Sequence, residues 1–357
     1  MMFVLAIETS CDETSAAVLR AAGGAETGGP GTCTEGTCPP SFAAPEVLSN
    51  IVLSQDEVHA PYGGVVPELA SRQHIKTIVA VVGESLARAD VRPDDIGLFA
   101  ATQGPGLIGS LLVGLSFAKG LAYYFRKPLV GVDHLEAHLE AAFLEHPEIL
   151  FPVLGLLVSG GHTSLYFMEE PLSYRRLGRT RDDAAGEVLD KVAKFLGLGY
   201  PGGPVIERLA RDGDARKFPF AMPRTKDRSL DFSFSGLKTA ALRRVRESGI
   251  TRDAPALADF LASFEEAVAR SLLDHVRRAV DESRPRSLVL CGGVARNVRL
   301  RTRFLDFAQQ AGLAAFVPSP KLCTDNAAMV GAVALRKFAR RPDLTLDLDL
   351  DAYPRSS

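Results

Sequence analysis

The sequence lacks an excess of charge of either sign. Its 41 Lys and Arg stand against 43 Asp and Glu, which gives a formal net charge of -2 and a pI near 6.4. No global positive field therefore draws the chain onto phosphate backbones. If RNA is a partner, its footprint must be local or shared with other subunits.

Cysteine is scarce as well. The five cysteines are an odd number and have neither the spacing of a disulfide framework nor that of a four-cysteine zinc site. This usage predicts a reducing compartment. Cys33 and Cys38 lie in the Gly-, Thr- and Pro-rich stretch 21–45, which predicts a flexible surface loop, and without partner residues they are weak evidence for a metal or a disulfide.

Long hydrophobic runs and a leader are missing. The first residues have no basic segment followed by an apolar one, and nowhere do about 18 apolar residues follow one another without a charge. We therefore expect a soluble cytoplasmic protein without a membrane partner.

Several common catalytic motifs are absent. The stretch GPGLIGS lacks the terminal Lys and Ser or Thr of a Walker A loop, no Rossmann fingerprint opens the chain, and no G-x-S-x-G elbow occurs. An ordinary P-loop ATPase, dehydrogenase or α/β-hydrolase is disfavoured.

What the sequence does contain is a duplicated pattern. Two apolar runs around a polar turn predict a strand hairpin at 3–19, and the same pattern returns at 153–168. Each hairpin is followed by a strand, a glycine loop and a helix, at 98–122 and at 287–304. This arrangement predicts a mixed α/β fold whose ligands gather at the carboxyl ends of strands.

A chain of 357 residues is also too long for one core, so two lobes are expected. We assign 1–150 to the first lobe, 151–340 to the second and 341–357 to a tail.

Two histidines stand four residues apart in GVDHLEAHLEAAFLEH. His134 and His138 would share one face of a helix, where both imidazoles can reach one metal ion, although an amphipathic helix with two incidental histidines explains them equally well. A zinc-protease motif would need Glu directly after the first histidine, where Leu135 stands. Asp325 is either a third ligand or the N-cap of the next helix.

Glycine pairs follow several predicted strands, at Gly104-Pro105-Gly106, Gly160-Gly161, Gly202-Gly203 and Gly292-Gly293. Glycine lets backbone N–H groups approach a phosphate, although each pair alone also fits a plain turn. Four such loops together favour a nucleotide ligand.

Charged groups gather in short segments. Glu8, Asp12 and Glu13 lie in the first hairpin, and Asp183, Glu187 and Asp190, next to Asp182, are expected on one face of a helix that either is solvated or holds a cation or ligand. Three basic groups could contact RNA phosphates or form solvated surface, since no aromatic residues are interleaved with them. They are Arg224, Lys226 and Arg228; Arg243, Arg244 and Arg246; and Arg296, Arg299, Arg301 and Arg303.

Taken together, the motifs resemble one family, the universal tRNA threonylcarbamoyladenosine transferases of bacterial type, once labelled O-sialoglycoprotein endopeptidases. The matching stretches include AIETSCDETSAAVL, HAPYGGVVPELASRQH, VDHLEAHLEA, LLVSGGHTSLY, DFSFSGLKTA and CTDNAAMVGA, and they run from about residue 3 to residue 335. Residues 23–45 include material that typical bacterial members lack. This departure interrupts no motif and so affects expected partner contacts and not the chemistry.

The resemblance implies a two-lobed fold like those of actin, Hsp70 and sugar kinases. It implies transfer of the threonylcarbamoyl group from threonylcarbamoyl-AMP to N6 of adenosine 37 in tRNAs that read codons beginning with A, with release of AMP. It also implies that His134, His138 and Asp325 bind Fe2+, or alternatively Zn2+. The implied partners are tRNA, a degenerate paralogue subunit and a small P-loop ATPase.

Substrate-binding positions carry over from the family's motifs residue by residue. They are Leu157, Val158, Ser159, Gly160, Gly161, Asp190, Gly203, Asn297 and, where some members bind the same ligand, Glu207. No general base is evident, and His162 and Glu13 are candidates. The rival hypotheses are a metalloprotease and a non-catalytic scaffold of the same complex.

Overall fold

The computed structural model describes residues 2–22, 44–221 and 229–355. Cys33, Cys38 and most of the loop expected at 21–45 lie outside the described residues, as do Arg224, Lys226 and Arg228.

The chain divides into two compact units. The first comprises Met1–His59, Val65–Glu148 and Pro318–Ser357, and the second comprises Ala60–Gly64 and Ile149–Val317. The N-terminal part of the first unit ends at Glu148, and the boundary expected from the sequence is at residue 150. The segment from Pro318 onward, which we had assigned to the second lobe and a tail, groups with the first unit.

Five strands form the sheet of the first unit: β1 (Phe3–Glu8), β2 (Glu13–Arg20), β3 (Glu46–Ser54), β4 (Ile96–Gly104) and β5 (Leu129–Asp133). They lie in the order β3-β2-β1-β4-β5. β1, β2 and β3 pair antiparallel, whereas β4 runs parallel to β1 and β5 runs parallel to β4. β1, β4 and β5 therefore present their carboxyl ends at one edge.

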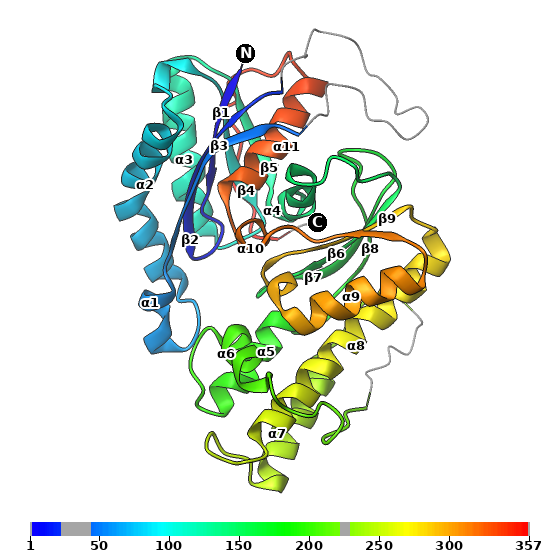
Figure 1. Cartoon of the computed structure of the whole chain (residues 1–357). Coiled ribbons are helices and arrows are strands. Elements are labelled where there is room, and N and C mark those ends of the chain that lie inside the picture. Colours follow the sequence, from blue (N-terminus) through cyan, green and yellow to red (C-terminus); the bar gives the residue numbers. More distant parts are fainter. Residues whose placement is uncertain (1, 23–43, 222–228, 356–357) are drawn as a thin grey trace. The chain divides into compact units, whose positions relative to one another are not determined.

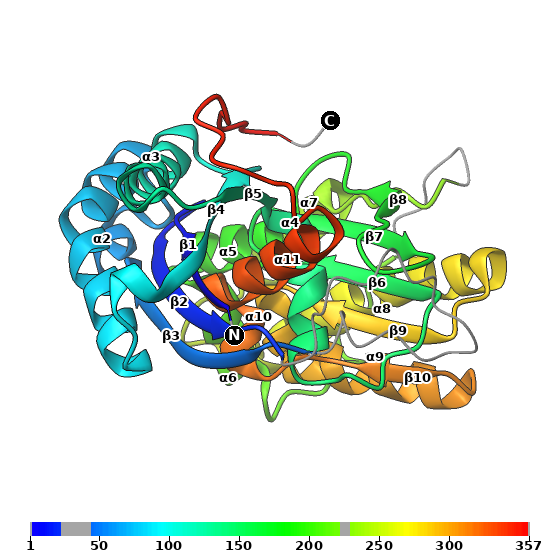
Figure 2. The same ribbon diagram turned by 90° about the horizontal axis from the view of Figure 1, so that it is seen from above.

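The helices of this unit are α1 (Asp56–His59), α2 (Pro67–Ala89), η3 (Pro93–Asp95), α3 (Ile108–Phe125), α4 (His134–Glu140), η4 (Ala141–Leu144), α10 (Pro320–Cys323) and α11 (Ala327–Arg340). α2 and α3 cover one face of the sheet and α11 covers the other (Figure 2). Because both faces are covered, the residues of β1 and β2 are buried almost without alternation.

The strands of the second unit are β6 (Val153–Val158), β7 (Thr163–Met168), β8 (Arg175–Arg179), β9 (Ser287–Cys291) and β10 (Ala314–Phe316). The sheet order is β10-β9-β6-β7-β8, as Figure 2 shows, and β6, β7, β8 and β9 are also labelled in Figure 1. The helices are η2 (Ala60–Tyr62), α5 (Ala185–Phe195), α6 (Gly202–Ala210), α7 (Ser235–Ser248), α8 (Leu257–Ser283), η5 (Gly293–Arg296) and α9 (Val298–Gln310).

The two sheets have the same topology. In each, an antiparallel meander of three strands is followed by two strands that join parallel to the first. The predicted hairpins at 3–19 and 153–168 are confirmed, as are the strand, loop and helix that follow each of them. The duplicated mixed α/β fold expected from the sequence is present.

Within the part of the chain that the structure describes, one helix, α3, is long and apolar enough to cross a membrane by length and composition. In the structure it packs against β4 and α2.

Two adjacent glycines after β9 differ in what surrounds them. Gly292 has φ of +90°, and a Cβ added there would lie 2.4 Å from the carbonyl oxygen of Val158 at the end of β6. A Cβ added at Gly293 would meet nothing within 4 Å. Close packing of the two strand ends therefore requires glycine at the first position only.

We predict that Gly292→Ala lowers the free energy of unfolding by roughly 1–3 kcal/mol, because it combines a strained backbone with overlap against a backbone oxygen. Gly293→Ala is the matched control and should change it by less than about 0.5 kcal/mol. Urea unfolding of both variants measures the difference. Equal stability of the two would contradict the packing argument.

Candidate functional site

Three side chains of the first unit converge on one point. His134 and His138 lie one turn apart on α4, directly after β5, and Asp325 directly precedes the N-cap residue of α11. Oδ1 of Asp325 lies 3.0 Å from Nε2 of His138 and 3.6 Å from Nε2 of His134. One ligand atom from each residue falls within 4.8 Å of the others. The structure thus assembles the three residues that the sequence singled out.

The alternative roles left open for these residues do not fit the structure. Asn326, and not Asp325, caps α11, since its side chain accepts the N–H of Met329. His134 and His138 are 4% and 0% exposed, so neither is an incidental surface histidine. The polar groups of all three residues instead face one another.

Glu8, at the end of β1, completes the surroundings of His134. Its Oε2 lies 3.1 Å from Nδ1 of His134, and the hydroxyl of Ser10 lies 3.2 Å from the same nitrogen. The Glu8 carboxylate also accepts hydrogen bonds from the N–H of Ser10 and the hydroxyl of Thr102. A carboxylate at Nδ1 favours a proton on that nitrogen, so that Nε2, which faces Asp325, is the nitrogen available to a metal ion.

Buried charges dominate the electrostatics of this cluster. Burial opposes a charge on His134, but the carboxylates of Asp325 and Glu8 raise its pKa to about 9. Burial would raise the pKa of Glu8, yet the neighbouring His134 holds it below its usual value. Burial, together with Asp325 and Asp12, raises the pKa of Glu13 well above its usual value. The site therefore favours a positive charge, from a proton or from a metal cation, among its carboxylates.

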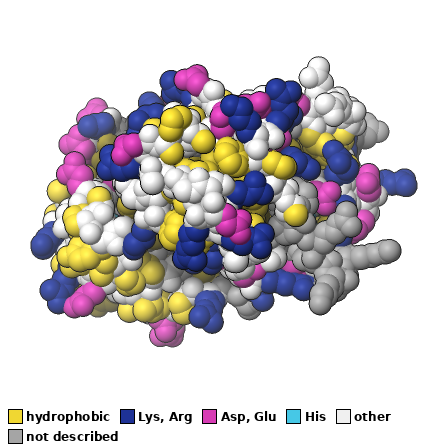
Figure 3. All heavy atoms as spheres, turned by 90° about the horizontal axis from the view of Figure 1, so that it is seen from below, with side chains coloured by type: hydrophobic (Ala, Val, Ile, Leu, Met, Phe, Trp, Pro, Cys, Tyr) yellow, Lys and Arg dark blue, Asp and Glu magenta, His cyan; other side chains and the backbone are white. Residues whose placement is uncertain are grey.

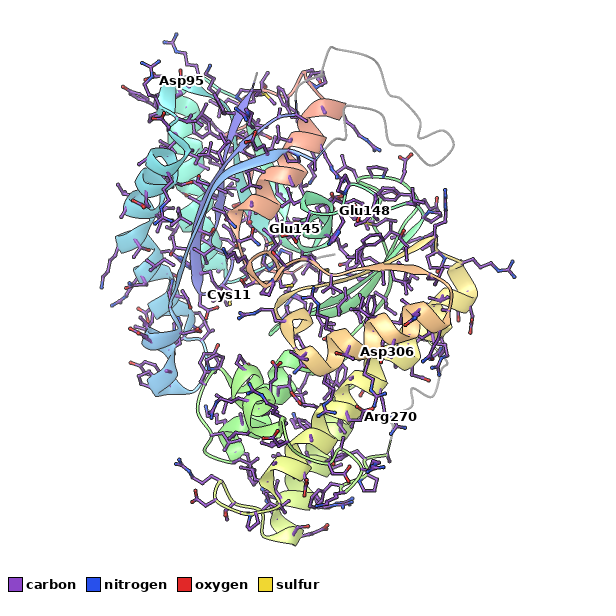
Figure 4. All side chains as sticks on the ribbon, in the orientation of Figure 1. Cys11, Asp95, Glu145, Glu148, Arg270 and Asp306 are labelled. Carbon is purple, nitrogen blue, oxygen red and sulfur yellow. The ribbon has the colours of Figure 1, made fainter. Side chains whose placement is uncertain are left out.

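Two ion pairs fasten α4 to α11. Glu140 and Arg336, both buried, form one pair at 2.5 Å, and Glu136 and Lys337 form the other at 3.1 Å. Glu145, labelled in Figure 4, accepts the N–H of Ser319 just before α10. These contacts fix the histidine-bearing helix against the segment that carries Asp325.

The C-terminal segment also reaches this edge of the sheet, which the sequence did not indicate. The hydroxyl of Tyr353 donates to Asp133, whose other carboxylate oxygen caps α4 at the N–H of Leu135. The N–H of Tyr353 donates to the carbonyl of Gln103. A Cβ at Gly104 would lie 2.2 Å from the carbonyl oxygen of Tyr353. The absence of a side chain at Gly104 therefore leaves room for the C-terminal segment.

In the second unit, the predicted substrate positions lie around the ends of β6 and β9. Leu157 and Val158 are fully buried within β6, so that neither side chain is accessible to a ligand. Ser159 opens the following turn, where its hydroxyl accepts the N–H of His162. The carbonyl of Ser159 accepts the N–H of Gly186 at the start of α5.

Several glycines around these strand ends face open space. A Cβ placed on Gly160, Gly161 or Gly293 would meet nothing within 4 Å, and one on Gly203 would meet a single methyl group at 3.9 Å. None of the four has a φ that favours glycine. Neither packing nor backbone conformation within the described residues explains these glycines, whereas the close approach of a ligand to the backbone would.

The side chains of the remaining predicted substrate residues accept hydrogen bonds from backbone N–H groups at helix N-termini. Asp190 accepts the N–H of Gly202 at 2.7 Å at the beginning of α6. Asn297 caps α9 and donates to Glu265, and Glu207 accepts the N–H of Val298 at 3.0 Å. Asn297 and Glu207, 90 positions apart in sequence, thus meet at one helix N-terminus.

The expected acidic helix face needs correction. Asp183 precedes α5 and is not part of it, and it pairs with Lys191 and Lys238. Asp182 accepts from the hydroxyl of Ser233 and from the backbone N–H groups of Phe234 and Ser235. Lysines and backbone amides therefore offset charges that we had considered either solvated or bound to a ligand.

Sequence comparison identifies the family. The model of TsaD, tRNA N6-adenosine threonylcarbamoyltransferase, matches residues 46–332. The chain belongs to this family. Curated relatives named tRNA N6-adenosine threonylcarbamoyltransferase include one from Anaeromyxobacter sp. (strain Fw109-5), 48% identical over 98% of both chains. Another, from Moorella thermoacetica, is 46% identical over 97% of this chain and 95% of its own.

Solved structures support the fold of this TsaD family member. Component A of (R)-2-hydroxyglutaryl-CoA dehydratase from Acidaminococcus fermentans superposes with a TM-score of 0.53 at 15% identity, over 96% of this chain and all of that one. HypF of T. kodakarensis gives 0.58 at 15% identity, over 94% of this chain and 48% of its own. At this identity the likeness concerns the fold alone, and it confirms the actin-like class expected from the sequence.

Proposed function

We propose that this chain transfers a threonylcarbamoyl group from threonylcarbamoyl-AMP to N6 of adenosine in the anticodon loop of tRNAs that read codons beginning with A. The similarity to named transferases over 98% of its length carries the proposal. In the reaction, a bond forms between N6 and the carbamoyl carbon, the bond from that carbon to the phosphate oxygen breaks, and N6 loses a proton as AMP leaves. With a good leaving group, alignment of the two substrates is the main task of the enzyme.

The open glycine turns support binding of the acyl-adenylate in the second unit. Gly160 and Gly161 can bring backbone N–H groups against a phosphate without a side chain in the way. The side chains of Asp190, Asn297 and Glu207 reach the N-termini of α6 and α9, and their oxygen atoms can accept hydrogen bonds from ribose hydroxyls. We assign these residues, with Ser159 and Gly203, to the substrate.

The donor set of the first unit fits a divalent metal ion. Ligand atoms held about 2.1 Å from one ion lie roughly 3.0–3.4 Å apart, close to the 3.0 and 3.6 Å separations from Asp325 to the two histidine nitrogens. Two histidines and one carboxylate are a common set for Fe2+ with open coordination positions, so we assign iron, with Zn2+ as the alternative. When bound, the ion would supply Lewis-acid stabilisation of charge on the substrate.

The structure offers no support for a protease. Glu136, the acidic residue between the two histidines, pairs with Lys337 at 3.1 Å. A general base in a zinc protease would instead face the metal-bound water. The complete set of His134, His138 and Asp325 likewise disfavours a purely structural scaffold. For removal of the N6 proton, His162 and Glu13 remain the candidates.

We further infer cytoplasmic assembly with a degenerate paralogue and a small P-loop ATPase, as the family resemblance implies. The first unit has a surface suited to such a partner. α2 and α3 expose apolar side chains along the groove between them, among them Ile75, Val79 and Leu112, which are 64%, 67% and 43% exposed. Hydrophobic side chains gather toward the lower left of Figure 3, the side on which α2 and α3 lie. An exposed apolar strip of this kind favours a protein partner.

The first prediction tests the reaction and the metal together. Unmodified tRNA incubated with threonylcarbamoyl-AMP, the partner subunits and this chain should yield threonylcarbamoyladenosine, detected by mass spectrometry of nucleosides. His134→Ala should lose bound metal, measured by elemental analysis, and at least about 100-fold in activity. His146→Ala, which changes a partly exposed histidine eight positions beyond His138, should retain both. Full activity in metal-free protein would refute the assigned role of the metal.

The second prediction concerns Glu8. Glu8→Gln keeps the shape of the side chain but removes the carboxylate at Nδ1 of His134, so the affinity for Fe2+ should fall about 10- to 100-fold. Competition with a chelator measures this directly, without a catalytic assay. Glu148→Gln, which changes an exposed carboxylate that faces His146 and neither of the two buried histidines, should leave the affinity unchanged. An equal effect of the two substitutions would argue against the orienting role of Glu8.

The third prediction concerns the partner. Leu112→Arg introduces a charge into the apolar strip and should prevent co-purification of the paralogue, while the unfolding midpoint changes little because the side chain is exposed. Leu305→Arg, an exposed leucine on α9 of the second unit, serves as the control. Retention of the paralogue by Leu112→Arg would place the contact elsewhere.

A further inference from the structure

The near-neutral net charge hides a strong asymmetry between the two units. The first unit contains 14 Lys and Arg against 23 Asp and Glu, a formal charge of -9. The second contains 27 against 20, a formal charge of +7. A positive field is thus present after all, confined to one unit, and charge asymmetry of this size is typical of chains that bind nucleic acid.

Ion pairs within the second unit offset some of these cations. Arg299 and Arg303 on α9 face Glu265 and Glu266 on α8. By contrast, Arg246 on α7 forms no ion pair among the described residues, and Arg243 has only an exposed contact of 3.7 Å to Glu247 on the same helix. Positive charge on α7 is therefore available for a ligand.

The fold places an aromatic ring beside this charge. The guanidinium of Arg246 lies 5.3 Å from the ring centroid of Phe195 on α5, and Phe195 is 41% exposed. The pair of Arg175 and Phe167 has similar geometry at 5.1 Å, but Phe167 is 6% exposed and cannot stack on anything outside. An accessible ring next to an unpaired guanidinium is the combination with which proteins bind unstacked bases and their phosphates.

The orientation of α7 supports the same surface. Leu237, Ala241 and Val245 are its buried residues, so that Arg246 and Arg243, three positions apart, lie together on the outward side. Arg244 is partly buried and, two positions before Arg246, lies on a different side of the helix. α5 links this surface to the substrate turn, since its first residues pack on Ser159 and its last residue is Phe195, about 15 Å further along the helix axis.

We propose that Phe195, Arg243 and Arg246 form a binding surface for single-stranded RNA, which holds nucleotides of the tRNA anticodon loop that neighbour the modified adenosine. Phe195 stacks on a base, and the two arginines contact phosphates. The inference rests on the proposed function, because that function supplies the RNA.

The test measures binding of a fluorescent anticodon stem-loop RNA to the full-length chain in complex with its partner subunits, at several salt concentrations. Phe195→Ala should weaken binding roughly 10-fold without changing the salt dependence, and Phe195→Tyr should restore it. Arg246→Ala should weaken binding and also reduce the slope of log K against log salt by about 0.7, the value for one phosphate contact on a single strand.

Arg244→Ala is the matched control on the same helix and should change affinity less than about twofold. If Phe195→Ala and Arg246→Ala, with unchanged unfolding midpoints, bind the RNA as tightly as the unsubstituted chain, the surface is not an RNA site. Loss of a partner subunit with unchanged RNA affinity would likewise overturn the inference and identify a protein interface.

Formation of threonylcarbamoyladenosine by the same preparations separates the two proposals. If the unsubstituted chain forms the nucleoside and both variants bind RNA normally, the proposed function stands and only the RNA-binding surface is disproved. If the chain binds RNA through Phe195 and Arg246 but never forms the nucleoside, the RNA-binding surface stands and the proposed function is disproved.

Discussion

The contact of Asp325 with His134 and His138 is the constraint on which much of the first unit depends. It joins residues almost 190 positions apart and brings charged groups into a buried space. Burial of charged groups is energetically unfavourable unless they have partners, and in this site further hydrogen-bonded residues surround the three side chains. Glu8 faces His134, Thr102 and Ser10 donate to Glu8, and Tyr353 donates to the residue that caps α4. The segment after Pro318 thus belongs with the N-terminal half for a chemical as well as a packing reason.

A different constraint shapes the second unit, where strand ends must approach closely and still leave backbone accessible. Gly292 and Gly186 are glycines because neighbouring carbonyl groups leave no room for a Cβ. Gly160 and Gly161 are glycines although there is room, and a ligand is the simplest physical reason for them. Sequence alone cannot distinguish the two kinds, since Gly292 and the residues Gly160 and Gly161 all belong to glycine pairs after a strand. The surroundings of the Cβ position separate them.

Periodicity and spacing were sufficient for the duplicated fold and for the proximity of the two histidines, whereas only the family resemblance implied a metal ion there. The repeated hairpins predicted two sheets of the same topology, and the i, i+4 spacing of His134 and His138 predicted their common direction. The sequence was less informative wherever a role depends on a distant partner. Asp183 seemed part of a helix face, but it precedes α5 and is paired by Lys191 and Lys238. No local pattern indicates that Glu8 faces a histidine 126 positions away or that Tyr353 returns to β4.

The same limit applies to charge. A net value of -2 suggested that the chain has no basic character of its own, because the sum runs over two units of opposite sign. The absence of aromatic residues among the basic segments also seemed to weaken any RNA contact. Helix packing brings together residues that are distant in sequence, since α5 places Phe195 beneath the guanidinium of Arg246 on α7.

The separation of charge between the two units also has a chemical reason. The buried carboxylates around the histidines of the first unit attract a cation but repel phosphates, so the binding of an RNA backbone is better served by the unit that carries the excess of arginine.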